Sequence, residues 1–391
     1  MLLAALLFAG ILTLWVPQRW ALSGFQISIL VLAAARIIQR LRAGASLTFS
    51  LPALLITAAP AWALLQSTAG WSIDRQRTLE SALEWVVNAA AFAIALEIST
   101  DTQRRARFLR ASLVFATALS VVVLFTLLTS PPGLAFWRFE TGSGVPTLGP
   151  FVYKNQYASF VEAILPLAVV GAIGGRRRWV VYTLISALLF GSVIAAGSRA
   201  GAILCSAEIL LIPAIAYARR DLRGKLFART LAASIAAMAL LTAIAGWEVM
   251  WNRLQEQHSY ELRRDLAISS MEMIRDRPWT GFGLGTWSSA YPGYARYDDG
   301  SFVNQAHNDW LQWAAEGGAP FFAVMLAFAA LMIRPAASAL WGLGILAVFA
   351  HAFVDYPFQQ RPALAAFFFA WMGMLWTGNS QPSLDAPDHG Y

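Results

Sequence analysis

Apolar runs long enough to form spanning helices recur along almost the whole chain, separated by short polar segments. A helix that crosses a bilayer needs about 20 mostly apolar residues. The pattern predicts twelve such helices, centred near residues 9, 28, 57, 89, 119, 163, 187, 209, 238, 322, 344 and 370. We therefore expect an all-α integral membrane protein with about twelve transmembrane helices.

One segment, from about residue 248 to 308, interrupts this pattern. Within it apolar residues recur at helical spacing, which predicts an amphipathic helix on the outer surface. They are Trp251, Leu254, Leu262 and Leu266, with His258 on the same face. Loops of this length in a compact protein are usually functional. The expected parts are helices 1–9 in residues 1–247, the loop in 248–308, helices 10–12 in 309–377 and a polar tail in 378–391.

The composition narrows the class of protein. The 391 residues are 58% hydrophobic and 13% charged, with a mean hydropathy of +0.55, whereas an average soluble domain is about 45–50% apolar and about 25% charged. This excludes an ordinary soluble enzyme and a disordered protein. The single cysteine, Cys205, excludes a disulfide framework and a cysteine zinc site.

The net charge of +7 comes from arginines that cluster in loops. With the N-terminus inside, the inside loops hold the clusters at residues 36–42, 104–110, 176–178 and 219–229, and the short outside loops hold fewer basic residues. Because basic residues favour the cytoplasmic side, we expect both termini in the cytoplasm. The charge is scattered over separate loops, so no nucleic-acid partner is expected.

The residues from His307 to Pro320 join the long loop to the tenth predicted span and are the strongest candidate for a site. Asn308 or Asp309 can cap this helix, which places His307 at its outer mouth. An imidazole there can titrate near neutral pH and act as a general base. Glu316 lies about half a turn out of phase with His307, and Pro320 should kink the helix. On spacing alone, a capped helix with an interfacial histidine is at least as good an interpretation.

The tight outer turn Gly197–Gly201 places Ser198 and Arg199 between two spans. The planar fork of an arginine suits a phosphate, so Arg199 is placed to meet an anion at the membrane surface. An arginine that reaches to lipid headgroups fits the same position equally well.

The loop core offers two more arginines, Arg263 and Arg264, followed by Gly281, Gly283 and Gly285. The glycines resemble a phosphate cradle but match neither a P-loop nor a dinucleotide fingerprint. Turn glycines beside a solvated helix face are the alternative interpretation.

Polar residues also lie at the ends of two other spans. Asn155 opens the sixth span, and His351 and Asp355 close the eleventh, where their i, i+4 spacing would allow contact on one helix face. A His–Asp pair is a poor zinc site, and we expect no metal. Interhelical or interfacial contacts are the favoured role of three acidic residues in or near spans, Glu97, Glu162 and Glu208.

The topology derived from loop charge places all of these candidate segments on the outer side of the membrane. Between them they offer three arginines, Arg199, Arg263 and Arg264, and His307 as a base. A cationic pocket with one base at the outer membrane surface suits an anionic lipid donor.

Together, the motifs resemble those of the O-antigen ligase and O-antigen polymerase superfamily. The resemblance covers about Pro146 to Pro362 and rests on four strings: His307-Asn308…Leu311…Glu316-Gly317, Ser198-Arg199-Ala200-Gly201, Gly149…Phe151…Asn155 and Pro278…Gly281…Gly283…Gly285. It implies a GT-C-like glycosyltransferase of the bacterial inner membrane, with twelve helices, a large periplasmic loop and an active site that faces the periplasm.

The resemblance also implies the chemistry. Such enzymes take a glycan from undecaprenyl diphosphate and need no metal and no other cofactor. His307 matches the histidine thought to activate the acceptor hydroxyl, Arg199 matches an arginine thought to hold the diphosphate, and Arg263, or alternatively Arg264, matches a second one. The supporting residues expected around them are Asn155, Ser198, Asn308, Glu316, His351 and Asp355.

The acceptor is the open question. A ligase hands the glycan to lipid A-core, and a polymerase of O-antigen or exopolysaccharide hands it to another lipid-linked unit; transfer to protein is a third variant. The compact chain favours a ligase. A transporter of lipid-linked glycans is the alternative from a different class, but it predicts broken helices paired between two repeats. The sequence offers one candidate broken helix, near Gly317–Pro320.

Overall fold

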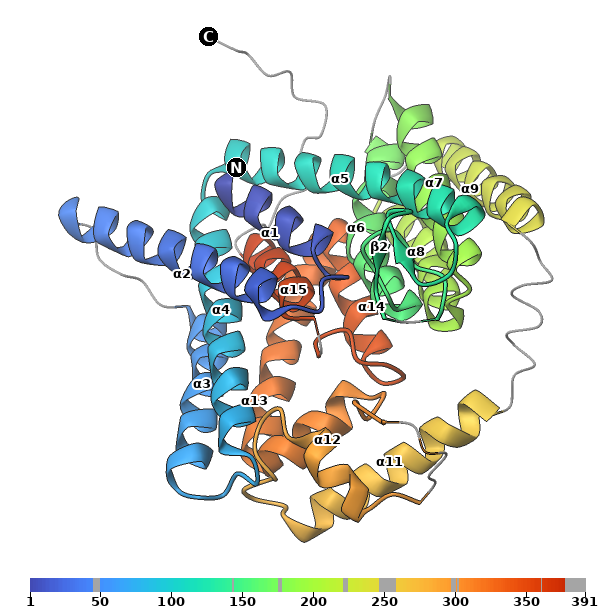
Figure 1. Ribbon diagram of the computed structural model, residues 1–391. Coiled ribbons are helices and arrows are strands. Elements are labelled where there is room, and N and C mark those ends of the chain that lie inside the picture. The colour runs from blue at the N-terminus through green and yellow to red at the C-terminus, as the bar shows by residue number, and fades with distance from the viewer. Residues whose placement is uncertain are drawn as a thin grey trace.

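The computed structural model describes residues 1–44, 50–142, 144–174, 178–220, 224–245, 258–296, 300, 302–359 and 361–376 (Figure 1). These residues are almost entirely helical. The helices are α1 (Leu2–Leu12), α2 (Arg19–Arg42), α3 (Leu51–Thr68), α4 (Arg75–Ser99), α5 (Thr102–Thr129), α6 (Lys154–Gly174), α7 (Trp179–Ala196), α8 (Arg199–Ala218), α9 (Gly224–Ala245), α11 (His258–Asp276), α12 (Trp287–Ala290), α13 (Asp309–Ser338), α14 (Leu343–His351) and α15 (Pro362–Trp376), with short 3-10 turns η1 (Tyr291–Gly293) and η2 (Leu340–Gly342).

Every one of the twelve predicted centres lies inside a helix. Among the described residues, eight helices, α2–α8 and α13, are long and apolar enough to cross a membrane. The apolar stretches in α1, α9, α14 and α15 are shorter. The protein is therefore an all-α, multi-pass membrane protein, and the number of twelve crossings stays a prediction.

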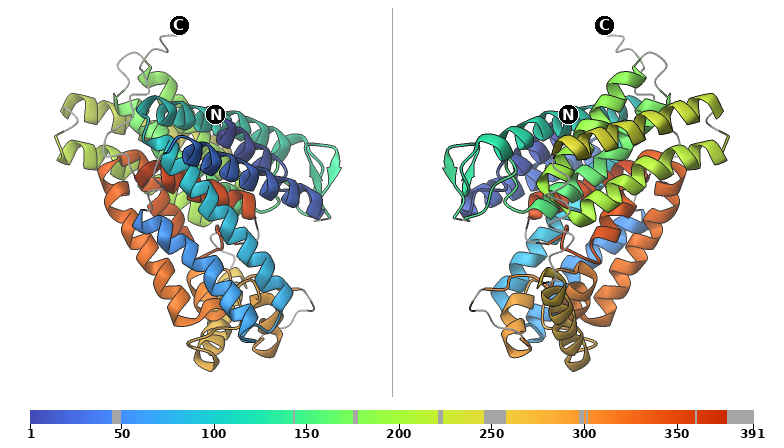
Figure 2. Two further views of the ribbon diagram at one scale, coloured as in Figure 1. Left: turned by 90° about the vertical axis from the view of Figure 1, so that its left-hand side faces the viewer. Right: turned by 90° about the vertical axis from the view of Figure 1, so that its right-hand side faces the viewer.

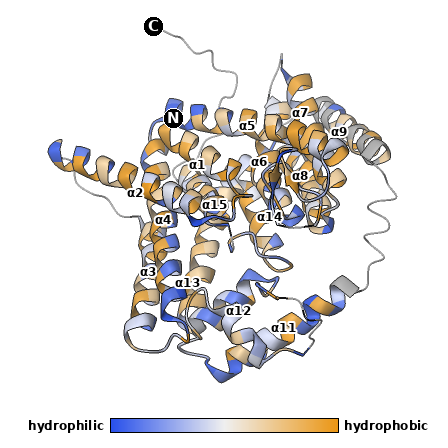
Figure 3. Cartoon of the chain, in the orientation of Figure 1, coloured by the Kyte–Doolittle hydropathy of each residue, from blue (hydrophilic) through white to orange (hydrophobic). Residues whose placement is uncertain are grey.

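The helices pack around α6, whose apolar window is 89% buried. The short helix α15 is also enclosed, with every residue from Ala363 to Leu375 buried. The surrounding spans instead expose large apolar side chains, such as Leu128, Leu184 and Ile203. Figure 3 shows apolar colour along much of the length of the helices in the bundle. Because water would disfavour such a surface, it fits contact with lipid.

Several helices begin where a short polar side chain caps the first turn. The capping residues that accept a backbone N–H are Ser50, Asp74, Asp101, Ser198 and Asn308. The predicted kink in α13 is confirmed, because Gly318 has non-helical dihedral angles (φ 67°, ψ −175°) two residues before Pro320. The helix therefore changes direction there and continues.

The connection between α5 and α6 contains a feature that the all-α prediction did not include. Strands β1 (Leu134–Ala135) and β2 (Phe139–Glu140) pair antiparallel, with Leu134 opposite Glu140. The hydroxyl of Thr147 donates to the carbonyl of Leu134 at 2.6 Å, which ties the following segment to the hairpin.

The long loop has a small core of its own, formed by apolar side chains of α11, α12 and the turns around them. Its largest members are Leu266, Met273, Phe282, Trp287 and Tyr291. The apolar face of α11 is thus covered by the loop itself. We expected this face to lie on the membrane surface, and the structure differs in this respect. In Figures 1 and 2, α11 and α12 lie together at the end of the molecule away from the N-terminus. Trp251, Leu254, the side chain of His258 and the tail 378–391 lie outside the described residues.

Candidate functional site

Side chains from distant segments converge on the carboxylate of Asp355, which is 2% exposed. Its Oδ2 accepts hydrogen bonds from the hydroxyl of Tyr153 at 3.0 Å and from Nη2 of Arg263 at 3.3 Å. The side-chain amide of Asn155 donates to the same oxygen. The other oxygen, Oδ1, accepts from the backbone N–H of Tyr356 at 2.9 Å. This buried charge therefore has both an ionic partner and hydrogen-bond donors, as a buried carboxylate requires.

His307 lies against the same carboxylate. Its Nδ1 is buried and 3.5 Å from Oδ1 of Asp355, while the side chain as a whole is 22% exposed. The imidazole ring packs edge-on against Tyr356, with ring centres 4.8 Å apart. A carboxylate on this side favours the proton on Nδ1, which leaves Nε2 to accept a proton.

The backbone fixes His307 at the start of α13. The residue has a positive φ of 52°, and the next residue, Asn308, caps the helix by accepting the N–H of Leu311 at 3.0 Å. The side-chain amide of Asn308 also donates to the carbonyl of Phe353 at 2.8 Å. Because Phe353 lies two residues before Asp355, this contact holds the two halves of the His–Asp pair together.

Charge and burial act in opposite directions on Asp355. Burial raises the pKa of its carboxyl, but the contact with His307 and the charges of His307, His351 and Arg263 outweigh it and lower the pKa to about 2. Burial, together with the negative charge of Asp355, raises the pKa of the Tyr153 hydroxyl well above its usual range. At neutral pH Asp355 is therefore ionised and Tyr153 is a neutral donor.

The turn between α7 and α8 joins this cluster through Asn155. The hydroxyl of Ser198 donates to Oδ1 of Asn155 at 2.8 Å, and it also accepts the N–H of Gly201 as the cap of α8. Arg199 follows directly, and its guanidinium lies 4.4 Å from the ring centre of Tyr260 in α11. Ser198 and Arg199 thus link the start of α8 both to the Asp355 cluster and to α11.

The two neighbouring arginines of α11 lie differently. Arg263 is half-buried and bonded to Asp355, whereas Arg264 is exposed. Tyr260 lies three residues before Arg263, so both share one face of α11. The face of α11 that carries Tyr260 and Arg263 is therefore turned towards the His–Asp pair. Arg199 packs on Tyr260 and so lies at the same face.

Glu316 is not part of this cluster. Its buried carboxylate accepts the backbone N–H groups of Gly285 at 2.9 Å and Trp287 at 3.0 Å, and the side-chain amide of Gln312 at 3.1 Å. The backbone N–H groups at the end of the glycine string, those of Gly285 and Trp287, therefore already bind a carboxylate of the protein. The interpretation as turn glycines is favoured over a phosphate cradle.

The glycine string packs against the kink of α13. Gly281 has a φ of +63°, and a Cβ built on it would lie 2.2 Å from the carbonyl oxygen of Glu316. The N–H of Gly283 donates to that same carbonyl at 2.9 Å. Gln66 of α3 also donates to it, at 2.8 Å, which joins three segments at one oxygen.

A side chain at position 281 should therefore disrupt the loop. We expect Gly281→Ala to destabilise the protein by about 2 kcal/mol or more, because it combines a left-handed backbone with a contact against main chain. Gly293→Ala is the matched control, since a Cβ there meets nothing within 4 Å. Thermal unfolding of both purified variants measures the difference, and equal midpoints would contradict the packing described.

His351 differs from its expected role. Its side chain does not pair with Asp355; its Nδ1 lies 2.7 Å from Oε1 of Glu162, and both side chains are fully buried. The backbone N–H of Asp355 still donates to the carbonyl of His351 at 3.0 Å, but the Asp355 carboxylate is bound by Tyr153, Asn155 and Arg263 instead. The interhelical role expected for Glu162 is confirmed, as is that of Glu97, which pairs with Arg36. The expected contact of Glu208 is not found, because both oxygens of its buried carboxylate lack a hydrogen-bond partner among the described residues.

Three aromatic residues of the site were missed by the sequence analysis. Tyr153 and Tyr356 stack on each other with ring centres 5.4 Å apart and enclose His307, and Tyr260 lies under Arg199. Tyr153 and Tyr356 are close in sequence to Asn155 and Asp355, which is the one signal that could have found them. The described residues contain no group of three or more His, Cys, Asp or Glu that could hold a metal ion.

A pH experiment tests the charge balance at Asp355. Since the folded-state pKa of about 2 lies below the ordinary value of 3.8, its stabilisation is fully present above pH about 4 and is lost as the pH falls towards 2. The difference between these two pKa values corresponds to about 2 kcal/mol of folding stability, at about 1.4 kcal/mol per pKa unit. We expect the unfolding midpoint of the detergent-solubilised protein to fall across this window, and to fall less in Asp355→Asn. An equal fall in both proteins would contradict the assignment.

The fold and this cluster define a class of protein: a multi-pass membrane protein in which a His–Asp pair and two arginines meet at the ends of the helices. Residues 184–326 match the family model described as O-antigen ligase. The match confirms the resemblance to the O-antigen ligase-like superfamily and supports a ligase- or polymerase-like function. It includes Arg199, Arg263, Arg264 and His307, while Asn155 and Asp355 lie outside it. No curated protein matches the chain.

Proposed function

We propose that this protein is a glycosyltransferase that moves a glycan from undecaprenyl diphosphate to lipid A-core at the periplasmic face of the inner membrane. In this proposal residues 248–308 form the periplasmic loop and both termini lie in the cytoplasm. The observation that carries it is the position of His307, with Nδ1 on the carboxylate of Asp355 and with Arg263 on the same carboxylate.

The proposed step is a direct displacement. Nε2 of His307 takes the proton of the acceptor hydroxyl while that oxygen attacks the anomeric carbon of the donor sugar. The bond from this carbon to the diphosphate oxygen breaks, and its electron pair leaves with the diphosphate. One attack from the opposite side inverts the anomeric centre. Diphosphate is a good leaving group, so the step requires no general acid.

Two arginines would stabilise the charge that develops on the leaving group. A guanidinium has five N–H donors, and among the described residues Arg263 donates through Nη2 to Asp355, so its other N–H groups can bind a phosphate oxygen. Arg199 lies beside the same helix through Tyr260. Fixed donors aimed at a developing charge are among the strongest catalytic effects.

Arg263 and Arg264 offer a matched pair for testing the donor contact. We expect Arg263→Gln to raise KM for the lipid-linked donor and to lower kcat/KM about 100-fold, because a charged donor to the leaving group is lost. Arg264→Gln removes the same charge from the exposed neighbour and should change kcat/KM less than threefold. Steady-state transfer assays with purified variants measure this, and equal effects would remove Arg263 from the donor site.

The acceptor is tested by reconstitution. The purified protein is placed in vesicles with a lipid-linked glycan donor, with and without lipid A-core, and the products are separated on a gel. Product that requires lipid A-core supports the ligase. A ladder from donor alone would make the protein a polymerase, and no transfer to either acceptor would contradict both and favour a transporter.

A further inference from the structure

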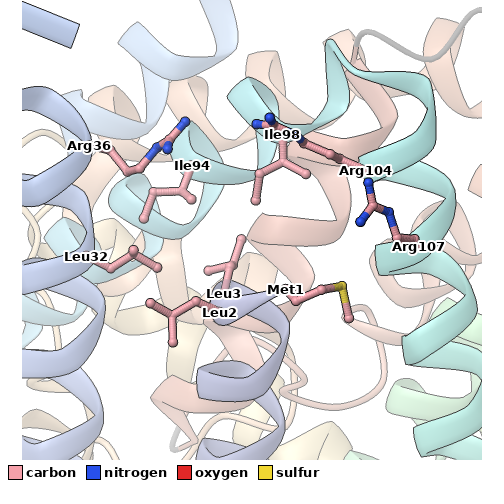
Figure 4. A pocket seen from close by; sticks show the side chains of 9 residues that line it. All are labelled: Met1, Leu2, Leu3, Leu32, Arg36, Ile94, Ile98, Arg104 and Arg107. Carbon is pink, nitrogen blue, oxygen red and sulfur yellow. The ribbon is translucent and has the colours of Figure 1, made fainter. Parts of the chain in front are cut away.

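A pocket lies between the start of α1, the second half of α2, the end of α4 and the start of α5. Its volume is about 350 Å³, and Leu3, Leu32 and Ile94 are among the apolar side chains of its wall. Three arginines, Arg36, Arg104 and Arg107, line it as well. Figure 4 shows the guanidinium groups along one rim, with Leu2, Leu3 and Leu32 on the opposite side of the view.

The charges at this rim do not cancel. Arg36 pairs with Glu97 at 2.5 Å, and Arg104 pairs with Asp101 at 3.1 Å. Arg107 makes no hydrogen bond or ion pair within the described part of the chain, and it lies in the first two turns of α5, near the positive end of the helix dipole. Positive charge is thus in surplus beside an apolar wall.

The pocket lies far from the His–Asp pair along α4. The first turns of α4 contact the glycine string, since a Cβ on Gly283 would meet Thr78. Ile94 lies sixteen residues further along the helix. At 1.5 Å per residue this is about 24 Å, which is close to the hydrocarbon thickness of a bilayer. The pocket therefore belongs to the opposite membrane face from α11 and α12.

We propose that this pocket binds one anionic glycerophospholipid, with its phosphate among Arg36, Arg104 and Arg107 and its acyl chains along the leucine and isoleucine wall. A phosphodiester with a neutral headgroup carries a negative charge, which the surplus of positive charge in the pocket attracts. A zwitterionic lipid would bring an ammonium group to the guanidinium groups. Basic pockets between membrane helices are known to hold anionic headgroups.

The occupant is a lipid and not free phosphate because the pocket is walled by apolar side chains and opens beside lipid-facing helices. Ile27 and Val31, which lie five residues and one residue before the lining residue Leu32 on α2, are both more than 60% exposed. Acyl chains would continue from the pocket onto this surface. The ligand site is separate from the transfer site and does not depend on the proposed function.

The test uses the full-length protein, purified in detergent and stripped of lipid. Thermal unfolding and native mass spectrometry are measured with phosphatidylglycerol, phosphatidylethanolamine or inorganic phosphate. We expect phosphatidylglycerol to raise the midpoint by several degrees and to give a bound adduct, and the other two to give neither. Arg107→Gln should reduce adduct formation about tenfold. Arg334→Gln, an exposed arginine outside the pocket, is the matched control and should bind as the unaltered protein does.

Three results would overturn the proposal. They are equal binding of phosphatidylethanolamine, full stabilisation by inorganic phosphate alone, and unchanged adduct formation in Arg107→Gln. Because Arg107 is exposed, its replacement should leave the fold intact, and the mass measurement reports binding independently of stability. Glycan transfer by Arg107→Gln is also measured at saturating donor. This measurement distinguishes a loss of lipid binding in the pocket from a loss of the proposed transfer activity.

Discussion

Replacing His307 by alanine is expected to reduce glycan transfer by at least 100-fold while leaving the protein folded. General-base catalysis contributes about 10²–10⁴-fold to such reactions, and His307 lies against the carboxylate that also binds Arg263. The loss should appear in kcat, because the proposed contacts of Arg199 and Arg263 with the diphosphate do not involve the imidazole. The measurement is the rate of product formation at saturating donor and acceptor.

The backbone at position 307 calls for a second variant. The positive φ of 52° disfavours most side chains, and asparagine is among the residues that tolerate it best. His307→Asn should therefore fold as well as the unaltered protein and still lose transfer. Donor binding, followed by a labelled lipid-linked glycan, should persist in both variants. Transfer at more than a tenth of the normal rate in either variant would remove His307 as the base.

The sequence predicted the helical architecture because hydropathy and capping are local properties. Each of the twelve apolar runs lies in a helix, and Asn308 and Pro320 correctly marked the start and the kink of α13. The phase of Glu316 relative to His307 also correctly excluded a contact between them. These inferences depend on spacing along one helix, which the chain itself determines.

The partners across helices were not predictable in the same way. His351 binds Glu162, which lies 189 residues earlier, and Glu316 binds backbone groups about 30 residues before it. No local periodicity encodes such pairs. The aromatic residues around His307 were hidden for another reason. Aromatic residues make up 13% of this chain, so a tyrosine beside a candidate polar residue carries little information by itself.

The second large effect is expected at Asp355. Asp355→Asn keeps the size of the side chain but removes the charge that orients His307, and we expect kcat to fall about 10²–10⁴-fold, as in other enzymes where a carboxylate holds a catalytic imidazole. KM for the donor should also change, because Arg263 loses its ionic partner. Glu316→Gln is the matched control, since it alters a buried carboxylate nearby that contacts Gly285 and Trp287 instead.

A double-mutant cycle separates positioning from other roles of Asp355. If the carboxylate acts through the imidazole, then Asp355→Asn should have almost no further effect on kcat once His307 is alanine. Glu316→Gln, which acts on loop stability, should lower the residual rate by the same factor in both backgrounds. A full multiplicative loss from Asp355→Asn in the His307→Ala protein would show that Asp355 acts through Arg263 and the donor. The His–Asp pair would then be a structural contact, and the base would act without a carboxylate behind it.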